Sequence, residues 1–93
     1  MYEWDPQKAR ANIAKHGVSF EVAIRIFEGP VLTRDDDSYD YLELREISIG
    51  MVGGAAILVV VHMDRFGSTR IISARPATRS ERVRYETELQ RSS

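Results

Sequence analysis

The chain contains no cysteine, which excludes a disulfide framework, a thiolate zinc site and a cysteine nucleophile. Without cross-links, its 93 residues must be held together by an apolar core. The longest apolar run, Ala55 to Val61, is too short to span a membrane, and the first residues lack the basic and apolar segments of a secretory signal. We therefore expect one domain over residues 1–93, located in the cytoplasm and not bound to a membrane.

A large net charge is also missing, because 13 basic and 14 acidic side chains leave a formal charge of −1. Bulk charge therefore cannot draw the protein to nucleic acid, and phosphate binding requires a local basic patch. The charges are nevertheless segregated: residues 1–46 carry six basic and ten acidic groups, and residues 64–93 carry seven and four. A basic patch is thus expected in the C-terminal third, while the acidic half could receive a basic partner.

Capping signals in the N-terminal half predict two helices. Asp5 before Pro6 indicates a helix over residues 6–16, which Gly17 ends in a left-handed conformation. Ser19 caps a second helix, whose apolar residues recur at helical spacing until a Gly-Pro pair stops it.

The remaining sequence predicts a largely antiparallel sheet and a closing helix. Gly53-Gly54 indicates a two-residue hairpin loop, which would pair Val52 with Ala55. Thr78 and Glu81 fit a capping box that opens the last helix. The fold class is therefore α+β, with two N-terminal helices, a meander of about four strands and a C-terminal helix. The segments with strand character are 1–4, 31–34, 45–52, 55–63 and 69–75.

Metal chemistry has weak support in the sequence. The run Asp35-Asp36-Asp37 suggests a cation site, but it lacks the Gly and bidentate Glu of a calcium loop, so a solvated turn is favoured. The two histidines lack HExxH-type spacing, and the chain has no Gly-x-Ser-x-Gly elbow of a serine hydrolase. We expect neither a metal nor a cofactor.

Charged side chains are expected to gather at one end of the sheet. The two-residue hairpin would place Arg45 opposite His62, and a second hairpin would bring Arg70 beside Met63. Guanidinium groups bind phosphate oxygens with two hydrogen bonds, although an exposed cluster of ion pairs is the structural alternative. The residues expected at this end are Glu43, Arg45, His62, Asp64, Arg65 and Arg70.

Further candidates lie away from this end. Arg75 is about 16 Å along the strand from Arg70 at ~3.3 Å per residue. It joins the same patch only if the register slips, the strand bends or the phosphate path runs lengthwise; otherwise it pairs with a helix carboxylate such as Glu81. His16 either stabilises the negative end of its helix or donates a proton, and Lys15 beside it is a surface cation or binds phosphate.

Several short strings occur in a specific order between residues 3 and 86. They are Glu3-Trp4-Asp5-Pro6, Asn12 with Lys15-His16-Gly17-Val18-Ser19-Phe20, Glu43-x-Arg45 with Ile49-Gly50, Arg70-Ile71-Ile72-Ser73-Ala74-Arg75, and Ala77-Thr78 followed by Glu81 and Tyr85. Together they resemble the BrnT ribonuclease toxins of the RelE-like superfamily of toxin–antitoxin systems. The resemblance implies a RelE-like fold that cleaves RNA without a metal. It also implies inhibition by a cognate BrnA-like antitoxin, whose ribbon-helix-helix part binds operator DNA.

The resemblance also implies an active surface built from Lys15, His16, Glu43, Arg45, the basic residue near Arg65, and Arg75. RNA cleavage needs the 2′-OH deprotonated, the phosphorane stabilised and the 5′-oxygen protonated. The chain departs from the family at His62, where an aromatic residue such as Tyr or Phe is expected. The residues expected to be catalytic are His16, Glu43, Arg45, Arg65 and Arg75, and those expected to bind substrate are Lys15, His62 and Arg70.

The favoured interpretation is a metal-independent endoribonuclease toxin that blocks growth. The alternative is a non-catalytic RNA-binding or protein-interaction module that uses the same basic surface. The strands carry Ile, Val and Arg rather than a face of aromatic residues, which favours positioning of phosphate over reading of bases. Expected partners are RNA, either free or on the ribosome, and the antitoxin, in a heterotetramer.

Overall fold

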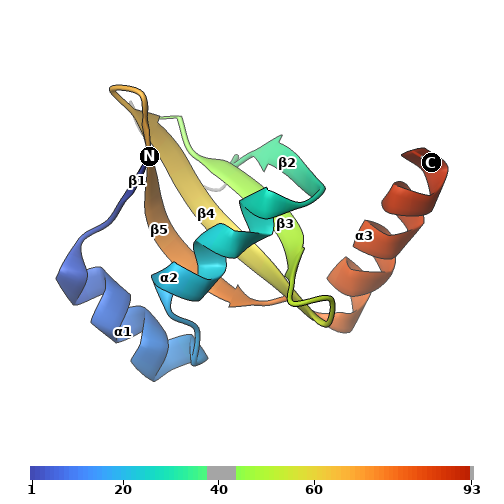
Figure 1. Cartoon of the computed structure of the whole chain (residues 1–93), viewed down its shortest axis with the longest axis horizontal. Helices are drawn as coiled ribbons and strands as arrows, with labels where there is room; N and C mark the ends of the chain where they lie inside the picture. The colour runs from blue at the N-terminus through green and yellow to red at the C-terminus, as the bar shows by residue number, and fades with distance from the viewer. Residues whose placement is uncertain (38–43, 93) are drawn as a thin grey trace.

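A computed structural model describes residues 1–37 and 44–92 (Figure 1). The α+β class is confirmed, but the sheet has five strands rather than about four and is mixed, because β1 runs parallel to β5. The elements in chain order are β1 (Tyr2–Glu3), α1 (Pro6–His16), α2 (Phe20–Ala23), the 3₁₀ helix η1 (Ile24–Glu28), β2 (Val31–Asp35), β3 (Glu46–Val52), β4 (Ala56–Arg65), β5 (Ser68–Pro76) and α3 (Arg79–Ser92).

The predicted helix caps are all present. The Asp5 side chain accepts a hydrogen bond from the backbone N–H of the second helical residue, and Gly17 has a φ of 71°. Ser19 caps α2 in the same way, but only the first turn of the predicted second helix is α-helical, and it continues as a 3₁₀ helix to Glu28. None of the helices in the described residues is both long and apolar enough to cross a membrane.

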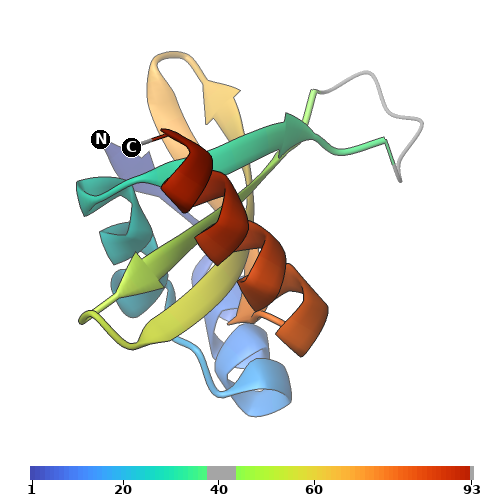
Figure 2. The same ribbon diagram turned by 90° about the vertical axis from the view of Figure 1, so that its right-hand side faces the viewer.

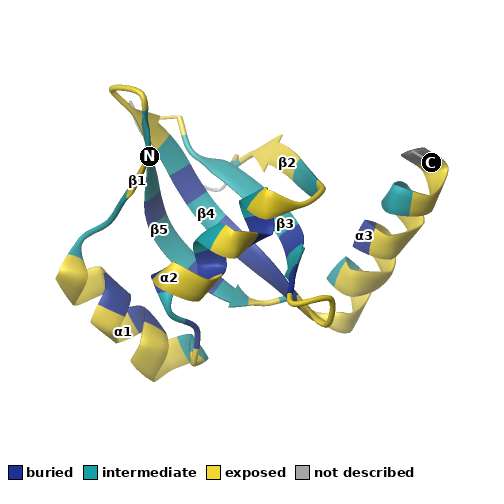
Figure 3. Ribbon diagram, viewed as in Figure 1, coloured by how far each residue is buried: buried dark blue, intermediate teal, exposed yellow. Residues whose placement is uncertain are grey.

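The sheet, in the order β1-β5-β4-β3-β2, has two different faces. Helices α1 and α2 with η1 cover one of them, which we call the core face, and α3 crosses the other, which we call the α3 face (Figure 2). Buried residues concentrate in the strands and on the sides of α1 and α2 turned toward them, whereas α3 is mostly exposed (Figure 3). The main apolar cluster comprises Ala9, Val18, Phe20, Ala23, Ile26, Val52, Leu58, Val60, Ile71 and Ala74.

On the core face, β3 carries small residues. A Cβ atom on Gly50 would lie 2.8 Å from the Cβ of Ile26 and 3.0 Å from Cγ1 of Val31, so η1 packs directly on bare backbone here. Ser48, two residues earlier, is fully buried on the same side. The isoleucines that alternate with these residues point to the opposite face, where burial is only partial.

The β3–β4 turn differs from the prediction by one residue. Gly53 and Gly54 both have positive φ, and the N–H of Ala55 donates to the carbonyl of Val52 at 3.3 Å, as expected of a tight hairpin. In the ladder, however, Val52 pairs with Ala56. Ala55 is therefore an extra residue between the turn and the first strand pair.

This shift overturns the predicted pairing of Arg45 with His62. His62 instead pairs with Glu46. Because successive side chains point to opposite faces, a slip of one residue also moves Arg45 to the face opposite His62. The predicted neighbourhood of Arg70 and Met63 is confirmed.

Candidate functional site

A β-bulge places two arginines of β5 on the α3 face. Arg70 and Arg75 are five residues apart and would point to opposite faces of a regular strand. However, Arg75 pairs with Val59 and Arg70 with Met63, and these two partners are four residues apart on β4 and so share a side. The register shift that allows this leaves Ile72 as the extra residue of β5. Both guanidinium groups therefore belong to the same surface.

The β2–β3 pair contributes two more arginines to this face. Arg34 pairs with Ile47 of β3, and Ile47 pairs with Val61 of β4. Val61 lies on the same side of β4 as the two residues that pair with the β5 arginines. The N–H of Asp36 donates to the carbonyl of Arg45 at 2.8 Å, which extends the β2–β3 pairing by one residue. The alternation of the strand then puts Arg45 on the side of Ile47. The α3 face thus carries arginines from two strands, β2 and β5, and from the approach to β3.

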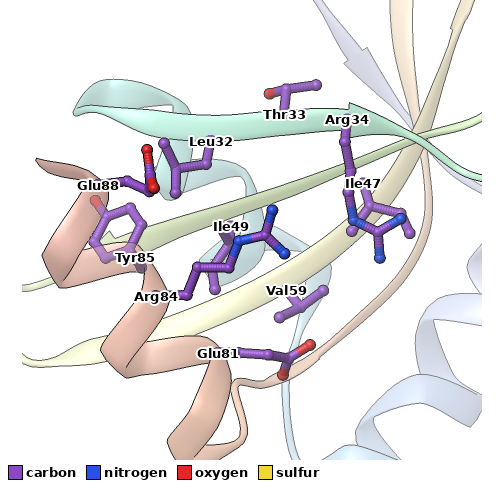
Figure 4. Close-up of a pocket in the computed structure, with 10 residues that line it drawn as sticks. All are labelled: Leu32, Thr33, Arg34, Ile47, Ile49, Val59, Glu81, Arg84, Tyr85 and Glu88. Carbon is purple, nitrogen blue, oxygen red and sulfur yellow. The ribbon is translucent and has the colours of Figure 1, made fainter. Parts of the chain in front are cut away.

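A groove of about 270 Å³ separates this face from α3 (Figure 4). Its floor is apolar, and the guanidinium groups of Arg34 and Arg84 lie over that floor. Tyr85 anchors α3 beside the groove, because its ring is buried and its hydroxyl donates to the carbonyl of Pro30 at 2.7 Å. Burial raises the pKa of that hydroxyl. The lining residues are Leu32, Thr33, Arg34, Ile47, Ile49, Val59, Glu81, Arg84, Tyr85 and Glu88.

Arg75 forms a two-pronged ion pair with Glu81, as the alternative reading of the sequence anticipated. Its two terminal nitrogens lie 2.8 and 2.9 Å from the carboxylate oxygens. The same carboxylate accepts the N–H of Thr78 at 2.8 Å, and the Thr78 hydroxyl accepts the N–H of Glu81 at 3.2 Å, so the capping box is confirmed. The hydrogen bond from Arg75 is the main reason that the pKa of Glu81 falls to about 2. The arginine side chain is still 40% exposed and can meet an anion from solvent.

The arginines form a row and do not meet at one point. Arg70 is held by Glu3 at 2.8 Å, near the β4–β5 hairpin, and Arg65 is exposed at the end of β4. The β4 partners of Arg70 and Arg75 are four residues apart, which is about 13 Å at ~3.3 Å per residue. One phosphate cannot contact both ends of the row, but a polynucleotide strand can follow it.

His62 lies on the core face, away from these cations. It is 7% exposed, and its Nε2 shares a 2.7 Å hydrogen bond with the Ser48 hydroxyl, which shares another of 2.7 Å with Thr33. Its ring meets Phe27 edge to face, with centroids 5.2 Å apart. Burial lowers the pKa of His62, and the nearby charge of Glu46 opposes this shift only in part. The imidazole is therefore a buried, hydrogen-bonded part of the packing.

The end of α1 reaches the edge of β5. His16 and Lys15 line a shallow depression there together with Ser73, which is opposite Val61 and so belongs to the α3 face. The buried side chain of Asn12 fixes this arrangement, because it donates to the carbonyl of Ala74 at 2.8 Å and accepts the N–H of the same residue at 3.1 Å. His16 is half-buried and Lys15 is exposed. Both therefore lie beside the sheet edge that carries Ser73.

Some of the predicted site cannot be placed, and some of the observed site was not predicted. Glu43 lies outside the described residues. Arg34 and Arg84 were not predicted; the alternation of its strand could have flagged Arg34, whereas nothing local marks Arg84. Within residues 1–37 and 44–92, no three His, Asp or Glu side chains are arranged to hold a metal ion.

Comparisons with known proteins agree with this architecture. A family profile described as "Ribonuclease toxin, BrnT, of type II toxin-antitoxin system" matches residues 4–81. The chain is also similar to the crystal structure of the Brucella abortus ribonuclease toxin BrnT, with a TM-score of 0.64 and 26% sequence identity. That similarity covers 85% of this chain and 99% of the Brucella chain. No curated protein sequence matches. The chain therefore belongs to the BrnT family of ribonuclease toxins of type II toxin–antitoxin systems.

Proposed function

We propose that this BrnT-family toxin is a cytoplasmic endoribonuclease that cleaves RNA on the α3 face without a metal. The 2′-OH attacks the adjacent phosphate, and the 5′-oxygen leaves. The observation that carries this proposal is the row of guanidinium groups on the face opposite the core, which the β5 bulge makes possible. Such a surface holds the phosphates of a strand and stabilises the charge that develops on the phosphorane.

We assign the roles of the residues from their chemistry and from the resemblance to the BrnT toxins. Arg45, Arg65 and Arg75 hold successive phosphates of the strand, because arginine stays charged at every relevant pH and matches phosphate oxygens in pairs. His16 protonates the leaving oxygen, and Glu43 is the candidate base. Lys15 and Arg70 contact flanking phosphates. His62 has no part in this proposal, because it is hydrogen-bonded on the core face.

We further propose that the α3 face receives the cognate antitoxin. A BrnA-like protein with an acidic or apolar segment would match both the arginine row and the apolar floor of the groove. It would block RNA physically, in a heterotetramer that binds operator DNA only through the antitoxin. If the protein cuts free RNA only slowly, we expect the ribosome to orient the RNA on this surface.

Cleavage of a labelled single-stranded RNA by wild type, Arg45→Ala and Arg75→Ala tests the function. Arg25→Ala is the matched control, since Arg25 lies on η1 with its side chain 53% exposed and pairs only weakly with Glu28 at 3.9 Å. We expect the first two variants to lose cleavage while circular dichroism stays native, and the control to match wild type. Unchanged cleavage in both variants would contradict the proposal, and binding of RNA without cleavage by wild type would favour a non-catalytic module.

A further inference from the structure

The tip of the β4–β5 hairpin presents an aromatic ring entirely to solvent. Phe66 is 100% exposed. Its φ is 53°, and it is the one non-glycine residue with positive φ in the described part of the chain. Gly67, which follows it, completes the turn with a φ of 86°. Two positive φ angles in succession are what a two-residue hairpin turn of type I′ requires.

Phenylalanine is a poor choice for this turn on local grounds. A side chain with a Cβ atom is strained in the left-handed region, and Asn, Asp and Gly tolerate it best. The ring buries no surface that would offset this strain. Neither the geometry of the turn nor packing in the core therefore explains why Phe occupies position 66. A contact between the ring and another molecule would explain it.

The turn that carries the ring adjoins one end of the arginine row of the α3 face. Arg65 precedes it and follows Met63 by two residues, so the pleat puts Arg65 on the α3 face, with Arg70 one strand away. The pleat turns exposed Asp64 to the other side. An exposed ring next to a cation is the arrangement that single-strand binders use, with a base on the ring and its phosphate on the cation.

We propose that Phe66 stacks on an unpaired base of the RNA, while Arg65 holds the phosphate next to that base. This inference rests on the proposed function and adds to it a contact with the base itself. Because every base has a π-face, the contact prefers single-stranded RNA without selecting a sequence. The hairpin then fixes where the strand leaves the arginine row.

Binding of a fluorescent, single-stranded 2′-O-methyl oligonucleotide, which cannot be cut by 2′-OH attack, tests the contact. We expect Phe66→Ala and Phe66→Leu to raise Kd about tenfold, in the range of a lost base–aromatic stack, and Phe66→Trp to bind at least as tightly as wild type. The control Val22→Ala removes an apolar side chain that is 41% exposed on α2 and should change nothing. When cleavable RNA is present at a saturating concentration, the cleavage rate of the Phe66 variants should stay within about twofold of the wild-type rate, because the lost contact affects binding and not the chemical step.

The affinities of the Phe66 variants for RNA and for the antitoxin decide between two kinds of partner. If Phe66→Leu binds the oligonucleotide as well as wild type, or if all variants bind alike, stacking is refuted. Altered affinity for the antitoxin with unaltered affinity for RNA would refute it too and would assign the ring to a protein contact. A wild-type protein that neither binds nor cuts RNA would instead refute the proposed function, which separates the two failures.

Phe66→Asn supplies a readout that a structural role would not give. Asn accepts the left-handed conformation more easily, so we expect Tm to rise by a few degrees while Kd for the oligonucleotide rises about tenfold. Stability and RNA affinity would thus change in opposite directions. A lower Tm would show that the ring supports the fold, and would overturn the inference.

Discussion

The two faces of the sheet use the same strands for opposite purposes. On the core face, η1 lies against the bare backbone of Gly50, and His62 is buried with its hydrogen bond satisfied by Ser48. On the α3 face, the strands carry arginines around an apolar floor, and one partly anchored helix covers them. Residues of the central strands therefore alternate between a face that is tightly packed and a face that is only partly covered.

The difference between the two faces explains how a domain of this size can hold many cations on its strands. A buried guanidinium without a partner would cost more free energy than a small core can supply. Here the cations stand on the partly covered face, and two of them are held by Glu3 and Glu81. The tight packing is left to the other face, so changes on the two faces should have separable effects on activity and stability.

The largest expected effect comes from removing a cation of the α3 face. We expect Arg75→Ala to lower kcat/KM for RNA cleavage at least 100-fold, as loss of a preorganised donor to developing charge does. Glu81→Gln is the matched variant, since both substitutions break the same ion pair but only the first removes the guanidinium. Steady-state cleavage assays should show the second to be much less impaired. Equal losses would mean that Arg75 acts through the ion pair alone.

The next largest effect is expected from a substitution that overpacks the core face. Gly50→Ala would force its new methyl group against Ile26 and should lower the free energy of unfolding by about 3 kcal/mol. Gly29→Ala is the control, because a Cβ there meets nothing within 4 Å. Urea denaturation measures both. A Gly50→Ala protein as stable as wild type would show that η1 does not seat on β3 as described.

A smaller loss should follow from breaking the buried hydrogen bonds of His62. Ser48→Ala leaves the imidazole without its partner and should cost about 2 kcal/mol of unfolding free energy. The double variant Ser48→Ala with His62→Phe replaces both partners by apolar groups and should recover most of it. Denaturation of the two single variants and the double variant completes the cycle. Additive losses would refute the coupling.

The smallest effect is a pH dependence from His62. Its pKa is lowered in the folded protein by burial, so the unfolded chain binds the proton more readily. The corresponding stability is present above the unfolded pKa, near 6.5, and is lost progressively as pH falls below it. Thermal melts between pH 7.5 and 5 should therefore slope less steeply for His62→Phe than for wild type. If the melting temperatures of the two proteins fell equally with pH, a group other than His62 would be responsible for the pH dependence.

Much of the fold was predictable because its signals are local. The cap at Asp5, the left-handed Gly17 and the capping box of Thr78 with Glu81 each involve residues within three or four positions of one another. Such contacts form in the same way whatever the rest of the chain does. The ends of α1 and the start of α3 were therefore predicted correctly.

The candidate site was only partly predictable. Sequence reasoning placed Arg70 and Arg75 on one strand and gave the ion pair of Arg75 with Glu81 as one of two alternatives, since both depend on one strand and the helix that follows it. It missed Arg84, whose helix lies over strands distant in sequence, and it put His62 with the cations. That error came from a single residue of register, which the hairpin glycines alone do not specify.

The sequence alone specifies the order of the helices and strands, the helix caps and the glycines at which the chain turns, because those depend on neighbouring residues. Only the tertiary structure decided which side of the sheet became the core, the one-residue shift at Ala55 and the bulge at Ile72. The alternation of side chains along a strand is the same whichever register the strand adopts with its neighbour, so the sequence pattern does not reveal a shift of one residue. The choice is made when η1 packs on Gly50 and when β5 pairs along β4, and those contacts join segments that are far apart in the chain.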